Sequence, residues 1–260
     1  MTNLNINSLW EERSKKYKTD PKGVLPKFLP TVLLEYLDGW MYSEVKKALN
    51  RKKLKILDLG CGYGRLASKI VKDYPGSYVS GVDISQEYVD LFNQELKEKG
   101  KAIKADIRRL PFKNESFDIV IAVTTLMYMV TKDDQSLAIK EILRVLKNGG
   151  QFVIIERNPP GHALITLGGL ATVLRGKTNC EIQSVGFTPQ KMENLINNSQ
   201  GSIAFKSGMP FWTLALPLEF LLSLTPIGSI FLKIIKFIDR IFSFLLTPSL
   251  YISYIGGRQE

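Results

Sequence analysis

The sequence predicts a doubly wound α/β fold, in which helices cover both faces of a mostly parallel sheet. Short apolar, β-branched segments alternate with amphipathic segments through residues 51–156, which is the pattern of βαβ units. A glycine-rich turn follows the first apolar segment, where such folds bind ligands. The chain has 260 residues, 45% hydrophobic and 23% charged. These values suit one large globular domain, or one domain with a lid.

The individual elements follow from this alternation in chain order. Apolar runs indicate strands, and apolar residues three or four apart indicate helices. The expected strands are 54–59, 78–83, 102–105, 117–123, 151–155 and 202–206. The expected helices are 65–72, 86–99, 134–147 and 189–197, the last with Thr188 as its cap and Pro189 in its first turn. Two earlier helices, 8–17 and 31–49, are expected to form an N-terminal helical cap within residues 1–50.

Charge and composition exclude several classes of protein. The formal net charge is +10, which suits nucleic acid, an anionic membrane surface or an anionic cofactor, but equally plain solubility. Two cysteines exclude a disulfide scaffold, and the single histidine, His162, excludes a histidine-cluster metal site; no metal is expected. The polar start of the sequence does not look like a signal peptide, and the few cysteines favour a reducing, cytoplasmic location.

A nucleoside site is expected where the first three strands end. Glycines alternate at Gly60, Gly62 and Gly64 after the first strand, which permits a tight turn and close approach of a ligand. Asp83 ends the second strand, 21 residues after Gly62, and Asp106 follows the third. Carboxylates at these strand ends suit ribose and base groups. The spacing differs from the G-x-G-x-x-G of dinucleotide-binding proteins, which argues against an oxidoreductase.

This region resembles the class I S-adenosylmethionine-dependent methyltransferases. The resemblance rests on ordered motifs within residues 51–156, namely 56–67, 82–85, 106–112, 116–120 and 141–150. It implies S-adenosyl-L-methionine as the cofactor and a sheet of seven strands, with 250–255 as an antiparallel seventh strand after an insertion. The core would then comprise residues 51–210 and 247–260, and the insertion residues 211–246.

The resemblance also assigns roles to individual residues. Gly60 and Gly62 would lie against the methionine part of the cofactor, and Asp83 would bind the ribose. The remaining cofactor-binding candidates lie at strand ends or, in one case, in the N-terminal helix: Asp58, Ile84, Asp106, Ile107, Thr124 and Tyr17.

Three residues are candidates for the acceptor side of the site. Tyr128 follows the fourth strand, Arg157 ends the fifth, and His162 follows in a loop rich in glycine and proline. Each has a plainer interpretation: Tyr128 as core, Arg157 as a structural residue, and His162 as a surface residue. Methyl transfer relies mainly on positioning, so a general base is needed only for acceptors that keep their proton.

Residues 211–246 form a compositional outlier. Residues 211–232 carry one charge, Glu219, and are long enough to span a bilayer, but two prolines and Gly228 argue against a simple span. From residue 229 the sequence is amphipathic, with Lys233, Lys236 and Arg240 on one helical face, as in helices that lie in a membrane interface. Peripheral membrane contact is the first interpretation, and a buried cap or a homodimer interface is the second.

The sequence therefore predicts a methyltransferase acting on a hydrophobic small molecule or lipid, resident in a membrane. Two alternatives stay open: a methyltransferase for a soluble small molecule, with the insertion as a cap or dimer interface, and a non-catalytic module that binds the cofactor. No nucleic-acid partner is expected, because no separate basic module appears in the sequence. The acceptor atom is not determined.

Overall fold

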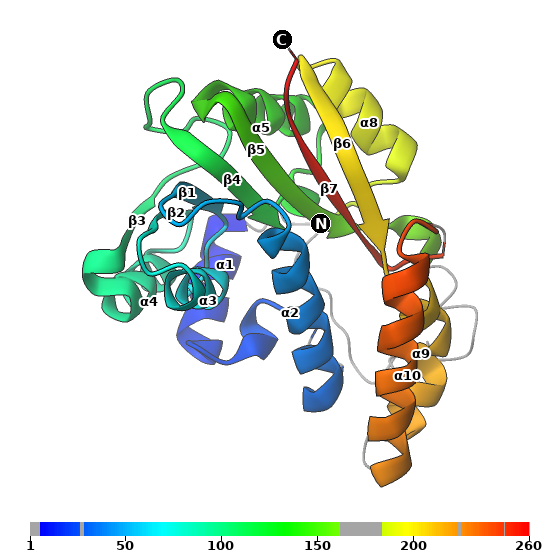
Figure 1. The fold of residues 1–260 in the computed structure, drawn as a ribbon. Helices are drawn as coiled ribbons and strands as arrows, with labels where there is room; N and C mark the ends of the chain where they lie inside the picture. Colours follow the sequence, from blue (N-terminus) through cyan, green and yellow to red (C-terminus); the bar gives the residue numbers. More distant parts are fainter. Residues whose placement is uncertain (1–5, 27–28, 162–183, 223–224, 247, 260) are drawn as a thin grey trace, which may run out of the picture.

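A central seven-stranded sheet organises the molecule (Figure 1). The structure is a computed structural model that describes residues 6–26, 29–161, 184–222, 225–246 and 248–259. The strand order is β3-β2-β1-β4-β5-β7-β6, in which β7 pairs antiparallel with both neighbours and the other pairs are parallel. The strands are β1 Lys55–Leu59, β2 Tyr78–Asp83, β3 Gly100–Lys104, β4 Phe117–Val123, β5 Leu146–Arg157, β6 Gly201–Gly208 and β7 Tyr251–Arg258. The predicted fold class is confirmed.

The helices also follow the predicted order. They are α1 Ile6–Tyr17, α2 Thr31–Lys46, α3 Arg65–Asp73, α4 Gln86–Leu96, α5 Lys132–Val145, α8 Pro189–Asn197, α9 Pro210–Leu222 and α10 Pro226–Phe242. The side chains of Ser85, Thr131 and Thr188 accept a backbone N–H at the start of α4, α5 and α8. The predicted Thr188 cap is therefore present, and such caps fix where helices begin.

Several boundaries differ by a few residues from the sequence-based expectation, and the end of α4 is the one with a clear physical reason. The helix predicted to run to residue 99 ends at Leu96, and after a short 3-10 turn Gly100 begins β3 instead of merely ending the helix. A Cβ atom at Gly100 would lie 2.5 Å from the carbonyl oxygen of Val79 on β2. Glycine is required here because the two backbones approach closely, a constraint that the helical pattern alone does not reveal.

Two apolar cores sandwich the sheet. Side chains alternate between its faces, as the pleat requires: Ile56 and Ile121 pack on one side, and Leu57 and Val120 on the other. The first core contains the apolar faces of α2, α3 and α4, and the second contains those of α5 and α8. The sheet is buried on both faces, so ligand sites are expected beyond the ends of its strands.

The apolar segment after β6 forms the helix pair α9 and α10, which lie side by side and extend from the sheet (Figure 1). The helix pair follows the C-terminal end of β6, which lies at the same edge of the sheet as the C-terminal end of β5. The pairing with β7 shows this: Gly208 of β6 pairs with Ile252, and Arg157 of β5 pairs with Tyr251, both at the start of β7. Among the described residues, no helix is long and apolar enough to cross a membrane. The chain therefore carries an apolar helical insertion beside its carboxyl sheet edge.

Candidate cofactor and active site

A cleft opens at the carboxyl ends of β1, β2 and β4. It encloses about 970 Å³, including space open to solvent, a size typical of small-molecule sites. Nine of the sequence-predicted site residues line it: Asp58, Gly60, Gly62, Asp83, Ile84, Asp106, Ile107, Thr124 and Tyr128. The fold therefore brings together residues that lie up to 70 positions apart in the chain.

The turn after β1 depends on its glycines. Gly60, Gly62 and Gly64 have φ angles of +66°, +51° and +88°, which L-residues with a Cβ atom rarely adopt. A Cβ atom at Gly60 would also lie 2.5 Å from the Oγ1 of Thr125. The backbone N–H of Gly60 donates to the carbonyl of Val82 on β2 at 2.8 Å. The turn is thus held close to the neighbouring strand ends, with its backbone facing the cleft.

Asp83 joins this turn to the end of β2. One carboxylate oxygen accepts the backbone N–H of Gly62 at 2.9 Å, and the other accepts that of Ser85 at 2.9 Å. Burial raises the pKa of Asp83 to about 6, against the opposing effect of these hydrogen bonds. The hydrogen bonds therefore fix the carboxylate in position, but they offset only part of the free-energy cost of its desolvation.

Asp58 makes the floor of the cleft more acidic. It is buried at the end of β1, and burial, followed by the charge of Asp83, raises its pKa to about 7. Two desolvated carboxylates in one cleft repel each other, and a bound cation would relieve both penalties. The site electrostatics therefore favour a positively charged ligand.

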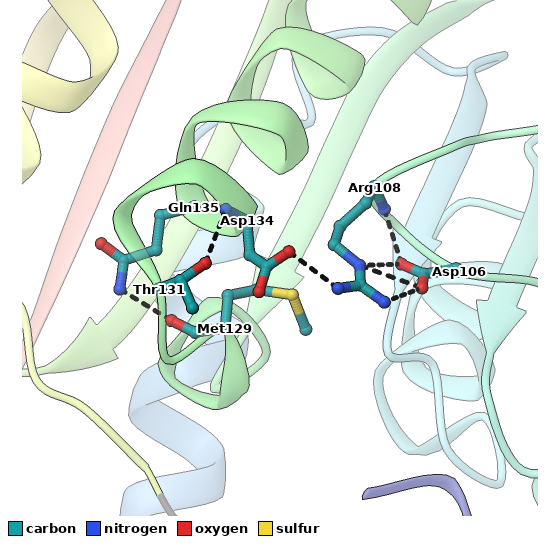
Figure 2. Close-up of polar contacts among 6 residues, drawn as sticks. All are labelled: Asp106, Arg108, Met129, Thr131, Asp134 and Gln135. Carbon is teal, nitrogen blue, oxygen red and sulfur yellow. Dashed lines mark hydrogen bonds and ion pairs between the residues drawn. The ribbon is translucent and has the colours of Figure 1, made fainter.

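The third acidic residue is held by an arginine clasp (Figure 2). Arg108 donates through Nε to Asp106 at 3.0 Å and through Nη1 to Asp134 at 2.7 Å. Burial opposes ionisation of Asp106, but the hydrogen bonds from Arg108 outweigh it and lower its pKa. Because Asp134 lies in the first turn of α5, Arg108 connects the loop after β3 to that helix. Asp106 is thus presented to the cleft as a carboxylate.

Aromatic side chains form one wall of the cleft. Trp10 of α1 contacts Tyr128 edge-on, with ring centroids 5.0 Å apart, and lies 6.4 Å from the ring of Tyr88. All three residues, together with Tyr63 and Met129, line the cleft. The buried hydroxyl of Tyr88 has no hydrogen-bond partner among the described residues. This wall is apolar enough for a hydrophobic group and contains polar atoms that a ligand could satisfy.

A buried glutamate supports the segment that carries Thr124 and Tyr128. Glu156, near the end of β5, accepts the backbone N–H groups of Thr125, Leu126 and Met127 at 2.9, 2.6 and 3.2 Å. Burial raises its pKa to about 8 despite these bonds. Three such bonds fix the turn after β4. Glu156 is a positioning residue that sequence reasoning missed, although a lone acid ending an apolar strand was a visible signal.

Comparison with known proteins identifies this architecture. Residues 57–154 match the family described as "Methyltransferase domain". These residues are therefore a methyltransferase domain, in a fold shared with solved S-adenosylmethionine-dependent methyltransferases. The matched range begins within β1 and ends within β5, so it contains the glycine turn, Asp83, Asp106 and Thr124.

Curated relatives of this methyltransferase domain include enzymes of lipid and quinone methylation. The chain is 33% identical over 144 residues to a ubiquinone/menaquinone biosynthesis C-methyltransferase of Geotalea daltonii, covering 53% of this chain and 60% of the relative. It is 31% identical over 138 residues to a sterol 4-C-methyltransferase of Caenorhabditis elegans, covering 51% and 40%. The chain spans about half the length of the curated relatives it matches.

Solved structures share the fold over more of the chain. A "possible histamine N-methyltransferase" of Thermotoga maritima superposes with a TM-score of 0.62 at 14% identity, covering 96% of this chain and 100% of the other. A protein of Pyrococcus horikoshii gives a TM-score of 0.59 at 18% identity, covering 94% and 99%. At these identities, the likeness concerns the fold.

The cleft of the methyltransferase domain fits S-adenosylmethionine, whose sulfonium and ammonium groups are cationic. The acidic pair Asp58 and Asp83 suits those charges, and Asp83 and Asp106 are acceptors suited to hydroxyl and amino groups. Gly60 and Gly62 leave the backbone accessible at the turn. These residues would hold the cofactor, which supplies a methyl group already activated on sulfur.

Two predicted site residues are absent from the lining of the cleft, and a third falls outside the described residues. Tyr17 and Arg157 are not among the residues that line the cleft. The guanidinium of Arg13 lies 5.4 Å from the ring centroid of Trp10, which lines the cleft, and 5.8 Å from that of Tyr17, which does not. Arg157 donates to Ser184. His162 lies outside the described residues. Their roles stay predictions.

Proposed function

We propose that the protein transfers a methyl group from S-adenosylmethionine to a hydrophobic small molecule or lipid drawn from a membrane. The observation that carries this proposal is the composition of the cleft, which has an acidic floor at Asp58 and Asp83 and an aromatic wall at Trp10 and Tyr128. The floor suits the cationic donor, and the wall suits an apolar acceptor. Relatives named as sterol and demethylmenaquinone methyltransferases support the same acceptor class.

The residues of the chain would act mainly by positioning. Asp83 and the glycine turn would hold the donor, while Trp10 and Tyr128 would orient the acceptor and exclude water. Glu156 would keep Thr124 and Tyr128 in place through the turn that it supports. Tyr128 would bring its hydroxyl to the acceptor side. Positioning of this kind suffices for an acceptor atom that is already nucleophilic, as in transfer to carbon next to an ionised oxygen.

The test uses the purified protein, methyl-labelled S-adenosylmethionine and a total extract of the source cells. After reaction, the label is partitioned between organic solvent and water. We expect label in the organic phase. Label only in the aqueous phase would contradict the hydrophobic acceptor and favour a soluble one. Cofactor binding without labelled product in either phase, from an extract that contains the unmethylated lipid and quinone precursors, would favour a binding module.

A matched pair of variants controls this assay. Asp83→Asn removes one of the two acceptors that hold Gly62 and Ser85, so labelled product should fall by about tenfold to a hundredfold, the range for a hydrogen bond to a charged group. Asp90→Asn changes an exposed aspartate on the neighbouring helix α4 and should leave the product unchanged. Equal activity of the two variants would contradict the role given to Asp83.

A further inference from the structure

The outer face of α10 carries an apolar stripe that no described part of the chain covers. Its five large side chains have exposed fractions between 52% and 67% and follow one another at spacings of three and four residues: Ile227, Ile230, Ile234, Phe237 and Ile241. At 3.6 residues per turn, these positions share one side of the helix. Phe244 just beyond the helix, and Leu214 and Leu218 on α9, add further exposed apolar surface. Contiguous apolar surface of this kind marks an interaction site.

The opposite side of α10 is firmly attached to the protein. Ile235 is buried in the core, and the buried carboxylate of Asp239 accepts the backbone N–H groups of Phe211 and Trp212 at 2.8 and 2.9 Å. Trp212 is fully buried and stacks on Tyr36 of α2, with ring centroids 5.7 Å apart. The outer stripe is therefore presented by an anchored helix, and it does not result from loose packing.

A flank of positive charge accompanies the stripe. Lys233, Lys236 and Arg240 are exposed and occupy a third side of α10, between the buried side and the apolar stripe. The acidic residue in the α10 sequence, Asp239, is buried as the cap of α9. The exposed surface of α10 is thus apolar on one side and basic on another, and all of its exposed charged side chains are basic. The chain as a whole has a net charge of +10. An anionic lipid surface is complementary to both properties.

A second copy of the chain is the rival occupant, because spacings of three and four also describe a coiled-coil seam. Two observations weigh against it. The stripe extends over 15 residues, about two heptads, whereas coiled coils are recognised from three or four. A second α10 would also bring another basic flank and no exposed acidic residue to pair with the first.

We propose that α10, with the exposed leucines of α9, is a docking surface for an anionic lipid membrane. The helix would lie in the interface with Ile227, Ile230, Ile234, Phe237 and Ile241 towards the acyl chains, and with Lys233, Lys236 and Arg240 at the headgroups. The helix pair leaves the sheet at the edge that carries the cleft. The surface deepens the proposed function by supplying the source of the acceptor, but its test requires no turnover.

The experiment measures co-sedimentation of the full chain with vesicles. One set contains phosphatidylcholine with phosphatidylglycerol, and the other contains phosphatidylcholine alone. We expect binding to the anionic vesicles that weakens as salt is raised, because screening reduces attraction to surface charge. Neutralising the basic flank with Lys233→Gln, Lys236→Gln and Arg240→Gln should lower the partition coefficient by about a hundredfold. The double variant Ile234→Asp and Phe237→Asp should abolish binding.

Control variants carry the same changes elsewhere. Lys52→Gln, Lys53→Gln and Lys99→Gln remove three exposed charges at the opposite edge of the sheet, and Leu137→Asp alters an exposed apolar residue on α5. Both should bind vesicles like the parent. Cofactor affinity, measured by calorimetry, should be equal in all variants, which shows that they are folded.

Three results would overturn the proposal. They are absence of binding to anionic vesicles, equal losses in the flank and control variants, and a stable dimer in solution that Ile234→Asp and Phe237→Asp convert to a monomer without any vesicle binding. Failure of the proposed methyl transfer would leave vesicle binding in place, so the two proposals fail separately.

Discussion

Two regions at the same edge of the sheet differ in what they expose: one is lined by hydrogen-bonded polar groups, and the other has an apolar outer face. At the ends of β1, β2 and β4, buried carboxylates and backbone N–H groups bond one another, as Asp83 does with Gly62 and Glu156 with Leu126. At α9 and α10, one buried carboxylate, Asp239, anchors the helix pair, and the outward face is apolar. The first part is shaped for a small polar ligand before the ligand arrives. The second exposes surface that only a partner would bury.

Because of this difference, we expect the two regions to tolerate different kinds of amino-acid substitution. In the cleft, small changes in shape should reduce ligand affinity, because the backbone itself lines the site. On the outer face of α10, shape should matter little, and charge and apolar area should matter most. The predictions below test this contrast, beginning with the largest expected effect.

The largest effect is expected for Gly60→Ala. The new methyl group would lie against Thr125 at a residue with φ of +66°, so the conformation and the crowding are both unfavourable, and stability should fall by about 2–5 kcal/mol. Cofactor affinity should fall by about a hundredfold or more, because the turn that carries Gly62 shifts. Denaturation by urea and calorimetry with S-adenosylmethionine measure the two effects.

Gly149→Ala is the matched control for this substitution. Gly149 also has a positive φ, +70°, but nothing lies within 4 Å of its Cβ position. Only the backbone cost of about 1–2 kcal/mol should appear, with unchanged cofactor affinity. Equal costs for the two variants would show that crowding by Thr125 is not what requires glycine at position 60.

Asp239→Ala should separate stability from cofactor binding. Removing the carboxylate leaves the N–H groups of Phe211 and Trp212 without their acceptor in a buried place, which should cost about 2–3 kcal/mol. Cofactor affinity should change by less than about twofold, because neither Asp239 nor its hydrogen-bond partners line the cleft. Asp133→Ala, at an exposed position in the first turn of α5, should cost far less. A large change in cofactor affinity would show that the helix pair and the cleft are coupled.

Cofactor affinity should depend on pH through the acidic floor. Burial raises the pKa of Asp58 to about 7 and that of Asp83 to about 6, so both lose protons as the pH rises through this range. A cationic ligand binds the ionised carboxylates better, and affinity should therefore increase by about tenfold between about pH 5 and 7.5. Calorimetry on Asp58→Asn should show a flatter profile. If cofactor affinity depended on pH as steeply in Asp58→Asn as in the parent, Asp58 would not contribute to cofactor binding.

The smallest effect is expected for Arg108→Gln. The clasp joins Asp106 and Asp134, but the Arg108 side chain is 41% exposed, and ion pairs at such positions contribute less than about 1 kcal/mol. Stability and cofactor affinity should each fall only slightly, by less than about fivefold in the dissociation constant. Arg109→Gln, at the exposed neighbouring position, should change neither. A loss comparable to that of Gly60→Ala would place Arg108 in direct contact with the cofactor.

The sequence predicted the succession of strands and helices and the polar end of the cleft because both depend on local patterns. Alternating glycines and acids at strand ends, such as Gly62 and Asp83, keep a fixed relation to the strands that precede them. Of the aromatic wall, Tyr128 was predicted but Trp10 was not, because an aromatic residue on a short N-terminal helix is typical of core packing. Tyr17, the residue of this helix that was predicted to bind the cofactor, lies two turns, or about 10 Å, further along α1.

Longer-range partners were beyond local patterns. The clasp of Arg108 depends on Asp134, which is 26 residues away in sequence, and the turn after β4 depends on Glu156, about 30 residues away. Only the fold brings these groups together. The basic and apolar sides of α10 were readable from its spacing, whereas the burial of Asp239 as a cap for α9 was not.

The position of β7 has a consequence for synthesis on the ribosome. This strand lies between β5 and β6 in the sheet, yet it follows α9 and α10 in the chain. Until residues 251–258 have emerged, β5 lacks its neighbour on that side and β6 cannot join the sheet. The apolar helices α9 and α10 are therefore synthesised before β7 can complete the sheet. A nascent chain at this stage would expose both an open strand edge and an apolar helix, which are the features that chaperones and membranes compete to cover.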